Sequence, residues 1–157
     1  AEAQAAAAKQ PLRVILDSRL RTPRNALMFK QATPILLVHN GQVDEAQLRD
    51  WPDFVELLAM PAKDGRVDLT ALLRELAQRQ CNEVMVEAGA NLASSFLRRG
   101  LLDEIIVYMA PKLLGSNARP LFELPLDTMS SSLALKIKDI RAVGRDWRIT
   151  AVPDTEY

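Results

Sequence analysis

The sequence contains very few of the residues that most often bind metals or form covalent intermediates. It has one cysteine, Cys81, and one histidine, His39, among 157 residues. A structural zinc site takes four Cys or His ligands and a cytidine-deaminase site takes three with a glutamate, so this pair excludes both. A Cys–His nucleophile pair is disfavoured because both residues lie in strand-like surroundings. Any enzymatic activity is therefore expected to depend on a bound cofactor.

The charge balance and the short hydrophobic runs exclude other classes of protein. Twenty basic residues balance twenty acidic ones, whereas a protein that binds nucleic acid normally has a basic excess. The longest apolar runs, 34–38 and 105–111, are far shorter than the roughly 20 residues of a membrane span, and no charged-then-apolar leader precedes them. A single cysteine excludes an internal disulfide and fits a reducing compartment. We expect a cytoplasmic protein without a membrane span, a secretory signal or a nucleic-acid partner.

Hydrophobic residues make up 48% of the chain, which is enough for the core of one domain. The Ala-rich residues 1–10 lack an apolar stripe and are predicted to be a tail, which leaves residues 11–157 as the domain. Short β-rich runs bounded by turn residues predict strands at 12–18, 34–41, 54–60, 82–89 and 103–111.

Two helices and a hairpin complete the predicted fold. Leucines at 69, 72, 73 and 76 have the spacing of one helix face, so a helix is predicted from an N-cap at Asp68 to about Gln80. Residues 90–100 predict a second helix that ends at Gly100. Residues 133–143 and 146–152 predict an antiparallel hairpin. The order predicts an α/β fold whose sheet has parallel neighbours and is mixed because of the hairpin.

The segment from residue 84 to residue 100 is the first candidate site. A predicted buried strand ends at Glu87, Gly89 follows, and the helix begins at about Asn91. The first N–H groups of a helix attract anions, and Gly89 would let a ligand approach the backbone closely. The alternative remains open that Gly89 only makes a tight turn which Glu87 caps.

Polar residues at other strand ends are weaker candidates. A buried Glu87 would need a partner, either a ligand hydroxyl or base N–H or an arginine of the protein. Asp17 and Ser18 would share its sheet edge if the strands are parallel, although a turn-forming pair is the simpler interpretation. His39 is expected at the surface in a turn, and Cys81 is expected to pack as a small apolar group.

Three segments together resemble a known family. These are LRVILDSRLRTP at 12–23, VMVEAGANLASSFLRRGLLDEIIVYMAPKLLGSNARPLFEL at 84–124, and a closing hairpin with VGRDW at 143–147. Over residues 11–152 they resemble the reductase domain of the bifunctional bacterial riboflavin-biosynthesis deaminase/reductase. The VEAG turn followed by DEIIVYMAPKLLG is more specific than either motif alone.

The resemblance implies a dihydrofolate-reductase-like mixed sheet flanked by helices. It implies NADPH-dependent reduction of the ribosyl group of 5-amino-6-(5-phosphoribosylamino)uracil, a small-molecule substrate, to the ribityl form, with Glu87 on the substrate. It also implies NADP contacts at Ser18, Gly89, Ala90, Asn91, Leu92, Ala93, Ser94 and Ser95. The hydride would come from the nicotinamide, so no side-chain nucleophile and no metal are needed.

The sequence differs from the family's pattern in two respects, which change the activity that we expect of this chain. The zinc deaminase domain is absent, and nothing before Leu12 resembles the family's first strand with its Ser-Leu-Asp-Gly-type motif. We therefore expect an N-terminally truncated reductase domain that forms a homodimer and has reduced or no turnover by itself. The alternatives are a non-catalytic nucleotide-binding or assembly module that pairs through an exposed sheet edge, and a phosphate-binding α/β domain for another substrate.

Overall fold

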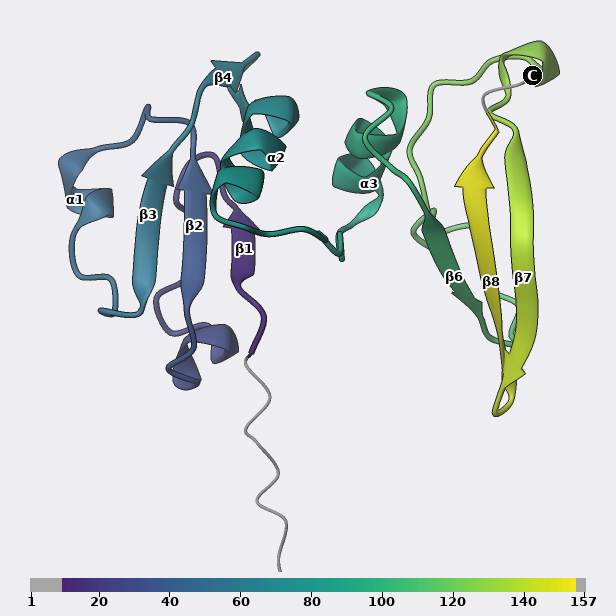
Figure 1. The fold of residues 1–157 in the computed structure, drawn as a ribbon, viewed down its shortest axis with the longest axis horizontal. Helices are drawn as coiled ribbons and strands as arrows, with labels where there is room; N and C mark the ends of the chain where they lie inside the picture. Colours follow the sequence, from purple (N-terminus) through teal and green to yellow (C-terminus); the bar gives the residue numbers. More distant parts are fainter. Residues whose placement is uncertain (1–9, 155–157) are drawn as a thin grey trace, which may run out of the picture. The chain divides into compact units, whose positions relative to one another are not determined.

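The computed structural model describes residues 10–154, except for the side chains of Lys63 and Ser130. The chain divides into unit 1, Ala1–Asn82, and unit 2, Glu83–Tyr157, each with its own sheet (Figure 1). Residues 1–9 of the predicted tail lie outside the described residues. The single reductase domain over residues 11–157 stays a prediction.

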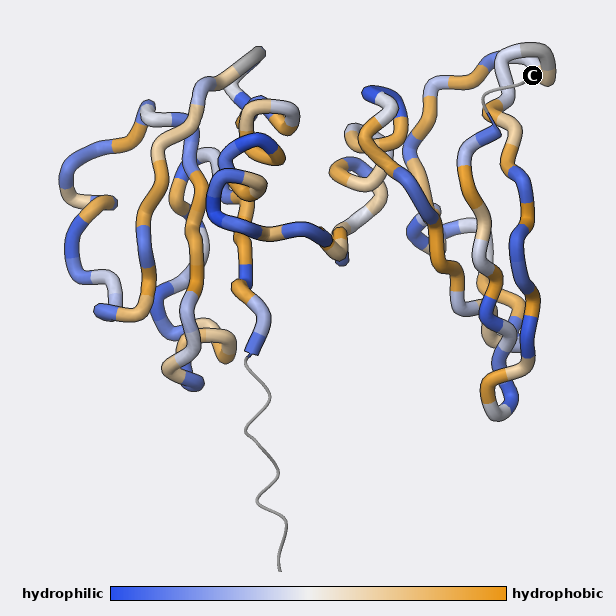
Figure 2. The backbone as a smooth tube through the Cα atoms, viewed as in Figure 1, coloured by the Kyte–Doolittle hydropathy of each residue, from blue (hydrophilic) through white to orange (hydrophobic). Residues whose placement is uncertain are grey.

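Unit 1 is built on a parallel sheet whose central strand is buried throughout. Its strands β1 (Arg13–Leu16), β2 (Ile35–His39) and β3 (Val55–Ala59) lie in the order β1-β2-β3. Every residue of β2 is buried, and Figure 2 shows hydrophobic residues along most of this strand. A continuous apolar run is typical of a parallel strand covered on both faces. The three predicted N-terminal strands are therefore confirmed, with parallel pairing.

The helix α2 (Leu69–Gln78) begins at the predicted N-cap. The Asp68 carboxylate accepts hydrogen bonds from the backbone N–H groups of Thr70 and Ala71, at 2.8 and 3.2 Å. This satisfies two of the N–H groups that a helix start leaves without partners. The helix predicted from its leucine spacing is confirmed.

The core of unit 1 lies where α2 packs on the sheet. Leu72 and Leu76 of α2 cluster with Leu36 and Val38 of β2, and all four are at most 2% exposed. Cys81 packs against this cluster, as predicted for a small apolar side chain. The leucine stripe of α2 therefore supplies one side of the core and β2 the other.

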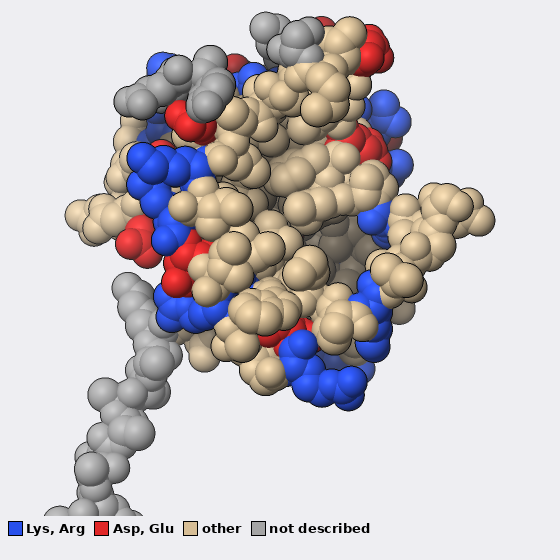
Figure 3. Space-filling view, turned by 90° about the vertical axis from the view of Figure 1, so that its right-hand side faces the viewer, with Lys and Arg blue, Asp and Glu red and all other residues tan. Residues whose placement is uncertain are grey.

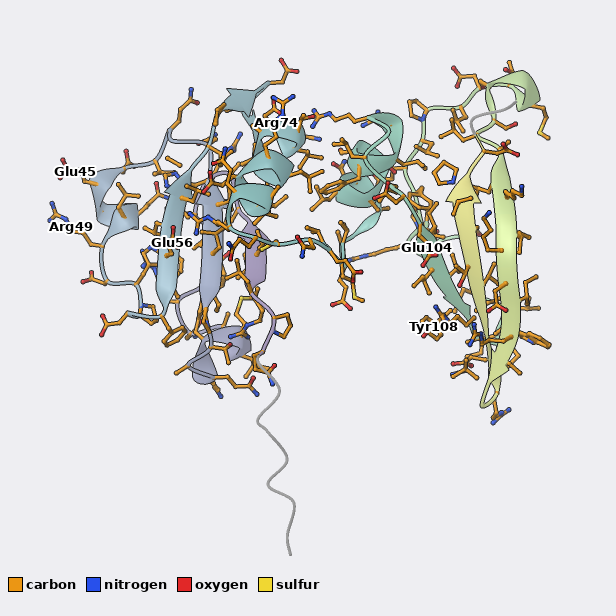
Figure 4. The ribbon with its side chains drawn as sticks, in the orientation of Figure 1. Glu45, Arg49, Glu56, Arg74, Glu104 and Tyr108 are labelled. Carbon is orange, nitrogen blue, oxygen red and sulfur yellow. The ribbon has the colours of Figure 1, made fainter. Side chains whose placement is uncertain are left out.

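An ion-pair network also fastens α2 to the sheet. The Arg79 guanidinium donates two hydrogen bonds to the Glu56 carboxylate on β3, at 2.8 and 2.7 Å, and a third to Glu75, at 2.8 Å (Glu56 is labelled in Figure 4). Hydrogen bonding from Arg79 holds the pKa of Glu56 below its usual value. The bidentate geometry fits the planar guanidinium.

Short elements that the sequence pattern did not predict connect these strands. They are η1 (Leu27–Lys30), α1 (Glu45–Leu48), and the two-stranded hairpin β4 (Ala62–Lys63) and β5 (Arg66–Val67). Four-residue helices and two-residue strands are too short to show a periodic pattern. The hairpin turn uses positive φ angles at Asp64 and Gly65, which Asp-Gly sequences favour.

Unit 2 holds the second helix and an antiparallel sheet. It contains α3 (Ala90–Arg98), β6 (Ile105–Met109), η2 (Met129–Ser131), β7 (Leu135–Val143) and β8 (Asp146–Pro153). The sheet order is β6-β8-β7, and Gly144 has a positive φ in the turn between β7 and β8. The predicted helix, strand and C-terminal hairpin are confirmed.

The predicted buried strand at residues 82–89 is wrong. No residue from 81 to 89 is in a strand, and Val84, Met85 and Glu87 are exposed. A strand exists only with a partner for its backbone N–H and C=O groups, and this segment has none among the described residues. The parallel strands and the antiparallel strands therefore pair within their own groups, and the predicted mixed α/β fold with parallel neighbours and a C-terminal antiparallel hairpin is confirmed.

His39 is buried, which corrects the expectation of a surface turn histidine. Its side chain is 5% exposed at the end of β2, and its Nδ1 atom accepts a hydrogen bond from the Gly41 backbone N–H, at 3.2 Å. Burial lowers the pKa of His39 below its usual value because the charged ring would lose its water.

Unit 1 is therefore expected to lose stability in acid through His39. Because the pKa of His39 is lower in the folded state, the unfolded state binds the proton more readily. The stabilisation is complete above the unfolded value of 6.5 and is lost as the pH falls through the folded value. Urea unfolding at a series of pH values, followed by Trp51 fluorescence, should show that the free energy of unfolding decreases as the pH falls. His39→Asn keeps an acceptor for the Gly41 N–H and should make the free energy of unfolding less dependent on pH. An equal dependence on pH in both proteins would contradict the prediction.

Candidate functional site

A polar pocket lies in unit 1 beside the carboxyl ends of β1 and β2. Its volume is about 330 Å³, and it is lined by Arg19, Arg21, Asn40, Gln42, Gln47 and Gly65. In open α/β sheets, ligands bind outside the carboxyl ends of parallel strands, where the connecting loops diverge. Its position makes this pocket the first candidate site.

The turn after β1 sets the direction of the two arginines. The Asp17 carboxylate accepts hydrogen bonds from the backbone N–H and the hydroxyl of Thr22, at 2.6 and 2.7 Å, which closes the turn. Leu20 has a φ of 50° and its side chain is buried. A left-handed leucine costs on the order of 1 kcal/mol, so the burial of its side chain offsets the strain. Arg19 and Arg21 on either side of it are exposed as a result.

The uncharged side chains of the pocket are held in place by hydrogen bonds. Asn40 donates to the Gly65 carbonyl at 3.2 Å and accepts from the Gln42 backbone N–H at 2.9 Å. Gln47 donates to the carbonyl of Arg19 at 2.8 Å. These bonds join three separate loops, so the rim of the pocket is preorganised.

The electrostatics of the pocket favour an anion. Two guanidinium groups line it and no carboxylate does. Within residues 10–154, neither Arg19 nor Arg21 forms an ion pair with an acidic side chain. Arginine presents a planar fork of donors that fits phosphate. A phosphate ester is therefore the chemical group that this pocket suits best.

Ser18, predicted to contact NADP, lies next to this pocket in the sequence. It follows Asp17 at the end of β1 and is half-buried. Its carbonyl accepts a hydrogen bond from the Asn40 backbone N–H, at 3.2 Å. This bond ties the turn after β1 to the turn after β2. Asp17 acts as a turn residue, which was the simpler interpretation of the pair.

In unit 2, the predicted anion site coincides with the start of α3. Gly89 is the N-cap, and its carbonyl accepts from the backbone N–H groups of Leu92 and Ala93, at 3.1 and 3.2 Å. Its φ of −69° is open to any residue, and a Cβ atom would meet nothing within 4 Å. The fold therefore does not require glycine here. Glu87, two residues earlier, is exposed rather than buried.

Polar side chains on the first turns of α3 bond to neighbouring groups. The buried Ser94 hydroxyl accepts from the Glu123 backbone N–H at 2.7 Å, which fixes the following loop on the helix. Asn91 donates to the Glu123 carboxylate at 3.3 Å, and the Ser95 hydroxyl donates to the Asn91 carbonyl at 2.9 Å. Ser94 thus has a structural role within unit 2.

The predicted site residues fall into two groups. Glu87 and the run from Gly89 through Ala90, Asn91, Leu92, Ala93 and Ser94 to Ser95 lie together at the start of α3, whereas Ser18 belongs to unit 1. The pocket arginines and amides of unit 1 were missed. The signal available for them was the pair of basic residues directly after the strand that ends at Leu16.

No three His, Cys, Asp or Glu side chains among the described residues are grouped so that they could hold a metal ion. Between residues 10 and 154, no helix has both the length and the apolar character needed to cross a membrane.

The chain matches known proteins over most of its length. The family described as "RibD C-terminal domain" matches residues 1–149. The riboflavin biosynthesis protein RibD of Escherichia coli is 39% identical over 139 residues, which are 88% of this chain and 37% of that protein. The 5-amino-6-(5-phosphoribosylamino)uracil reductase of Buchnera aphidicola from Acyrthosiphon pisum is 32% identical, over 92% of this chain and 69% of that protein.

A solved structure, RibD of Acinetobacter baumannii, superimposes with a TM-score of 0.74 at 32% identity. The match covers 91% of this chain and 37% of that one. A Thermotoga maritima deaminase/reductase at 19% identity shares the fold, with a TM-score of 0.74. The chain thus spans between a third and two fifths of the length of the RibD proteins that it matches.

Proposed function

Because this chain belongs to the RibD C-terminal domain family, we propose that it binds NADPH and reduces the ribosyl group of 5-amino-6-(5-phosphoribosylamino)uracil. Its fold is the mixed α/β, dihydrofolate-reductase-like fold of the RibD reductase domains. Two observations support an oxidoreductase: the name of the Buchnera relative, and a chain with one cysteine and one histidine. Such a reductase needs a nucleotide cofactor, which supplies the hydride.

The pocket of unit 1 is the observation that carries the proposal. NADPH differs from NADH by one phosphate on the adenosine ribose, and the pocket presents two arginines and no carboxylate. The hydrogen bonds from Asn40 to Gly65, from Gln42 to Asn40 and from Gln47 to Arg19 hold the rim in place before any ligand binds. This chemistry supports a preference for the phosphorylated cofactor.

The predicted residues of α3 are proposed to hold other phosphates of the cofactor. The backbone N–H groups at the start of the nine-residue α3 point toward its N-terminal end, where the helix dipole is positive. Gly89 leaves the space before these groups open. Ser18, Gly89, Ala90, Asn91, Leu92, Ala93, Ser94 and Ser95 are the proposed NADP contacts.

Glu87 is proposed to bind the substrate. Its carboxylate is exposed and can accept a hydrogen bond from a ligand hydroxyl or N–H. Reduction also needs the ribosyl carbon to be held against the nicotinamide, which is a task of orientation. We further propose a homodimer and a cytoplasmic location, the latter because a lone cysteine suits a reducing compartment.

The test is a calorimetric titration of the chain with NADPH and with NADH. NADPH should bind saturably and at least tenfold more tightly than NADH. In a second step, Gly89→Thr should weaken NADPH binding at least tenfold, because its side chain would fill the open space before α3. Threonine is a favourable N-cap, so the melting temperature should stay the same.

Gly115→Thr is the matched control, because Gly115 also has open space around its Cβ position and lies in an exposed loop of unit 2. This variant should bind NADPH like the wild type. Equal binding of the two nucleotides would contradict the choice of NADPH. Equal losses in the two glycine variants would remove α3 from the cofactor site.

A further inference from the structure

The turn after β2 brings together the groups of one amide reaction. Asn40 is the one asparagine of the chain that a glycine follows, and Gly41 has a φ of 75°. In an Asn-Gly pair, the backbone nitrogen of the glycine can attack the side-chain amide carbon of the asparagine, because glycine has no Cβ atom to block the approach. The product is a succinimide ring, and ammonia is released. The contacts of Asn40 and Gly41 decide whether the fold assists this reaction.

The nucleophile of this reaction already bonds to a base. The Gly41 backbone N–H donates a hydrogen bond to the Nδ1 atom of His39, at 3.2 Å. An amide nitrogen attacks as its proton leaves, so an acceptor at this atom assists the step. Burial lowers the pKa of His39, which keeps the ring neutral and the Nδ1 lone pair available at neutral pH. His39 therefore lies where a general base has to be.

The side-chain amide of Asn40 is also held for attack. Its Oδ1 atom accepts a hydrogen bond from the Gln42 backbone N–H, at 2.9 Å, which folds the amide back over the Gly41 peptide. The same N–H can stabilise the negative charge that develops on Oδ1 when the nitrogen adds to the amide carbon. The Nδ2 group donates to the Gly65 carbonyl, at 3.2 Å, which orients the leaving amine. Orientation of this kind raises the rate of a reaction between neighbouring groups.

We propose that Asn40 is a site of self-catalysed deamidation. The Gly41 nitrogen forms a bond to the Cγ atom of Asn40 while its proton passes to His39. The bond from Cγ to Nδ2 then breaks as that proton is delivered to the leaving ammonia. Water opens the succinimide to aspartate or isoaspartate, so the reaction needs no other reactant. Asn40 lines the polar pocket of unit 1, and Gly41 and Gln42 are exposed, so water has access to the ring.

The reaction changes the charge of the pocket in which Asn40 lies. Either product adds a carboxylate to a pocket that is lined by Arg19 and Arg21 and by no carboxylate. Basic and acidic side chains are interspersed on the face of the molecule in Figure 3, whereas the charged side chains of this pocket are all basic. A carboxylate here would pair with the guanidinium groups and repel a phosphate. Deamidation therefore weakens NADPH binding, a consequence that rests on the function proposed above.

Peptide mapping by mass spectrometry, during incubation of the full chain at neutral pH, tests the site. The folded protein should deamidate Asn40 about tenfold faster than the same chain in urea, because only the fold places His39 and the Gln42 N–H. Folded His39→Asn, whose side chain accepts from Gly41 but is not basic, should lose this advantage. Gln42→Ala is the matched control, because it keeps the backbone N–H and should react like the wild type. A folded wild-type rate equal to or below the rate in urea, or an unchanged rate in His39→Asn, would overturn the proposal.

A second experiment separates this proposal from the cofactor assignment. Asn40→Asp carries the charge of the product and should bind NADPH about tenfold more weakly than the wild type. Asn40→Ser is the neutral control, because its hydroxyl can still accept from the Gln42 N–H, and it should lose much less affinity. Equal losses in the two variants would overturn the effect on the pocket. If the wild type does not bind NADPH, the proposed function alone is refuted, and the deamidation rates still decide the site.

Discussion

Replacing Arg19 and Arg21 together by alanine is expected to weaken NADPH binding roughly a hundredfold and to leave NADH binding nearly unchanged. A hydrogen bond to a charged group contributes about 1.5–3 kcal/mol, which is about tenfold or more in affinity for each arginine. Both guanidinium groups line the pocket, and no carboxylate lines it to compete for them. NADH lacks the ribose phosphate, so it should not respond. Calorimetric titration of both nucleotides measures the difference.

Arg74→Ala is the control for this prediction. Arg74 is an exposed arginine of α2 in the same unit, and it does not line the pocket (Figure 4). Its replacement removes one positive charge, as each of the two pocket substitutions does, and should change NADPH affinity less than twofold. If Arg74→Ala weakens NADPH as much as the double variant, the effect is one of overall charge and the pocket is not the phosphate site. If NADH weakens in parallel with NADPH, the arginines do not discriminate between the two cofactors.

The parts of the fold that could be predicted are those in which local pattern and burial agree. The run from Ile35 to His39 is apolar throughout and became the central strand, and the leucine spacing after Asp68 became a helix with that residue as its cap. In both cases the residues that form the element also form its contacts with the core. For these two elements, the pattern of hydrophobic residues in the sequence is therefore enough to predict the secondary structure.

The segment around Val84 to Val86 shows where such patterns are insufficient. Its side chains favour a strand, but strand formation depends on a neighbouring strand for hydrogen bonds, and composition does not specify one. His39 was misjudged for a related reason. It stands next to an Asn-Gly turn, and only the tertiary fold shows that its ring lies inside.

The pocket of unit 1 could be predicted only in part. The basic residues that follow a strand can be recognised in the sequence. That both of them line one pocket depends on the positive φ of Leu20 between them, which a leucine rarely adopts. The amides that complete the pocket come from Asn40, Gln42 and Gln47, which lie after β2 in the chain whereas the arginines lie after β1. Proximity of this kind arises from the parallel pairing of β1 with β2.

Leu36→Ala is expected to destabilise unit 1 by about 2–5 kcal/mol, the range for removing a fully buried leucine from a core. Leu36 is completely buried in β2 and clusters with Leu72 and Leu76 of α2. The cavity would lie between the sheet and the helix, where the ion pairs of Arg79 limit collapse of α2 onto the sheet. A loss of this size is a large share of the stability of a small domain.

The two tryptophans allow this loss to be assigned to one unit. Trp51 lies in unit 1, where its ring stacks under Arg24 at 3.6 Å and meets Phe29 edge-on, and Trp147 lies in unit 2. Urea unfolding of Leu36→Ala in a Trp147→Phe background should show the Trp51 transition at a much lower urea concentration. Leu27→Ala, which truncates a leucine that is 76% exposed, is the control and should move the midpoint little. Equal shifts in the two variants would mean that Leu36 is not part of the core that stabilises unit 1.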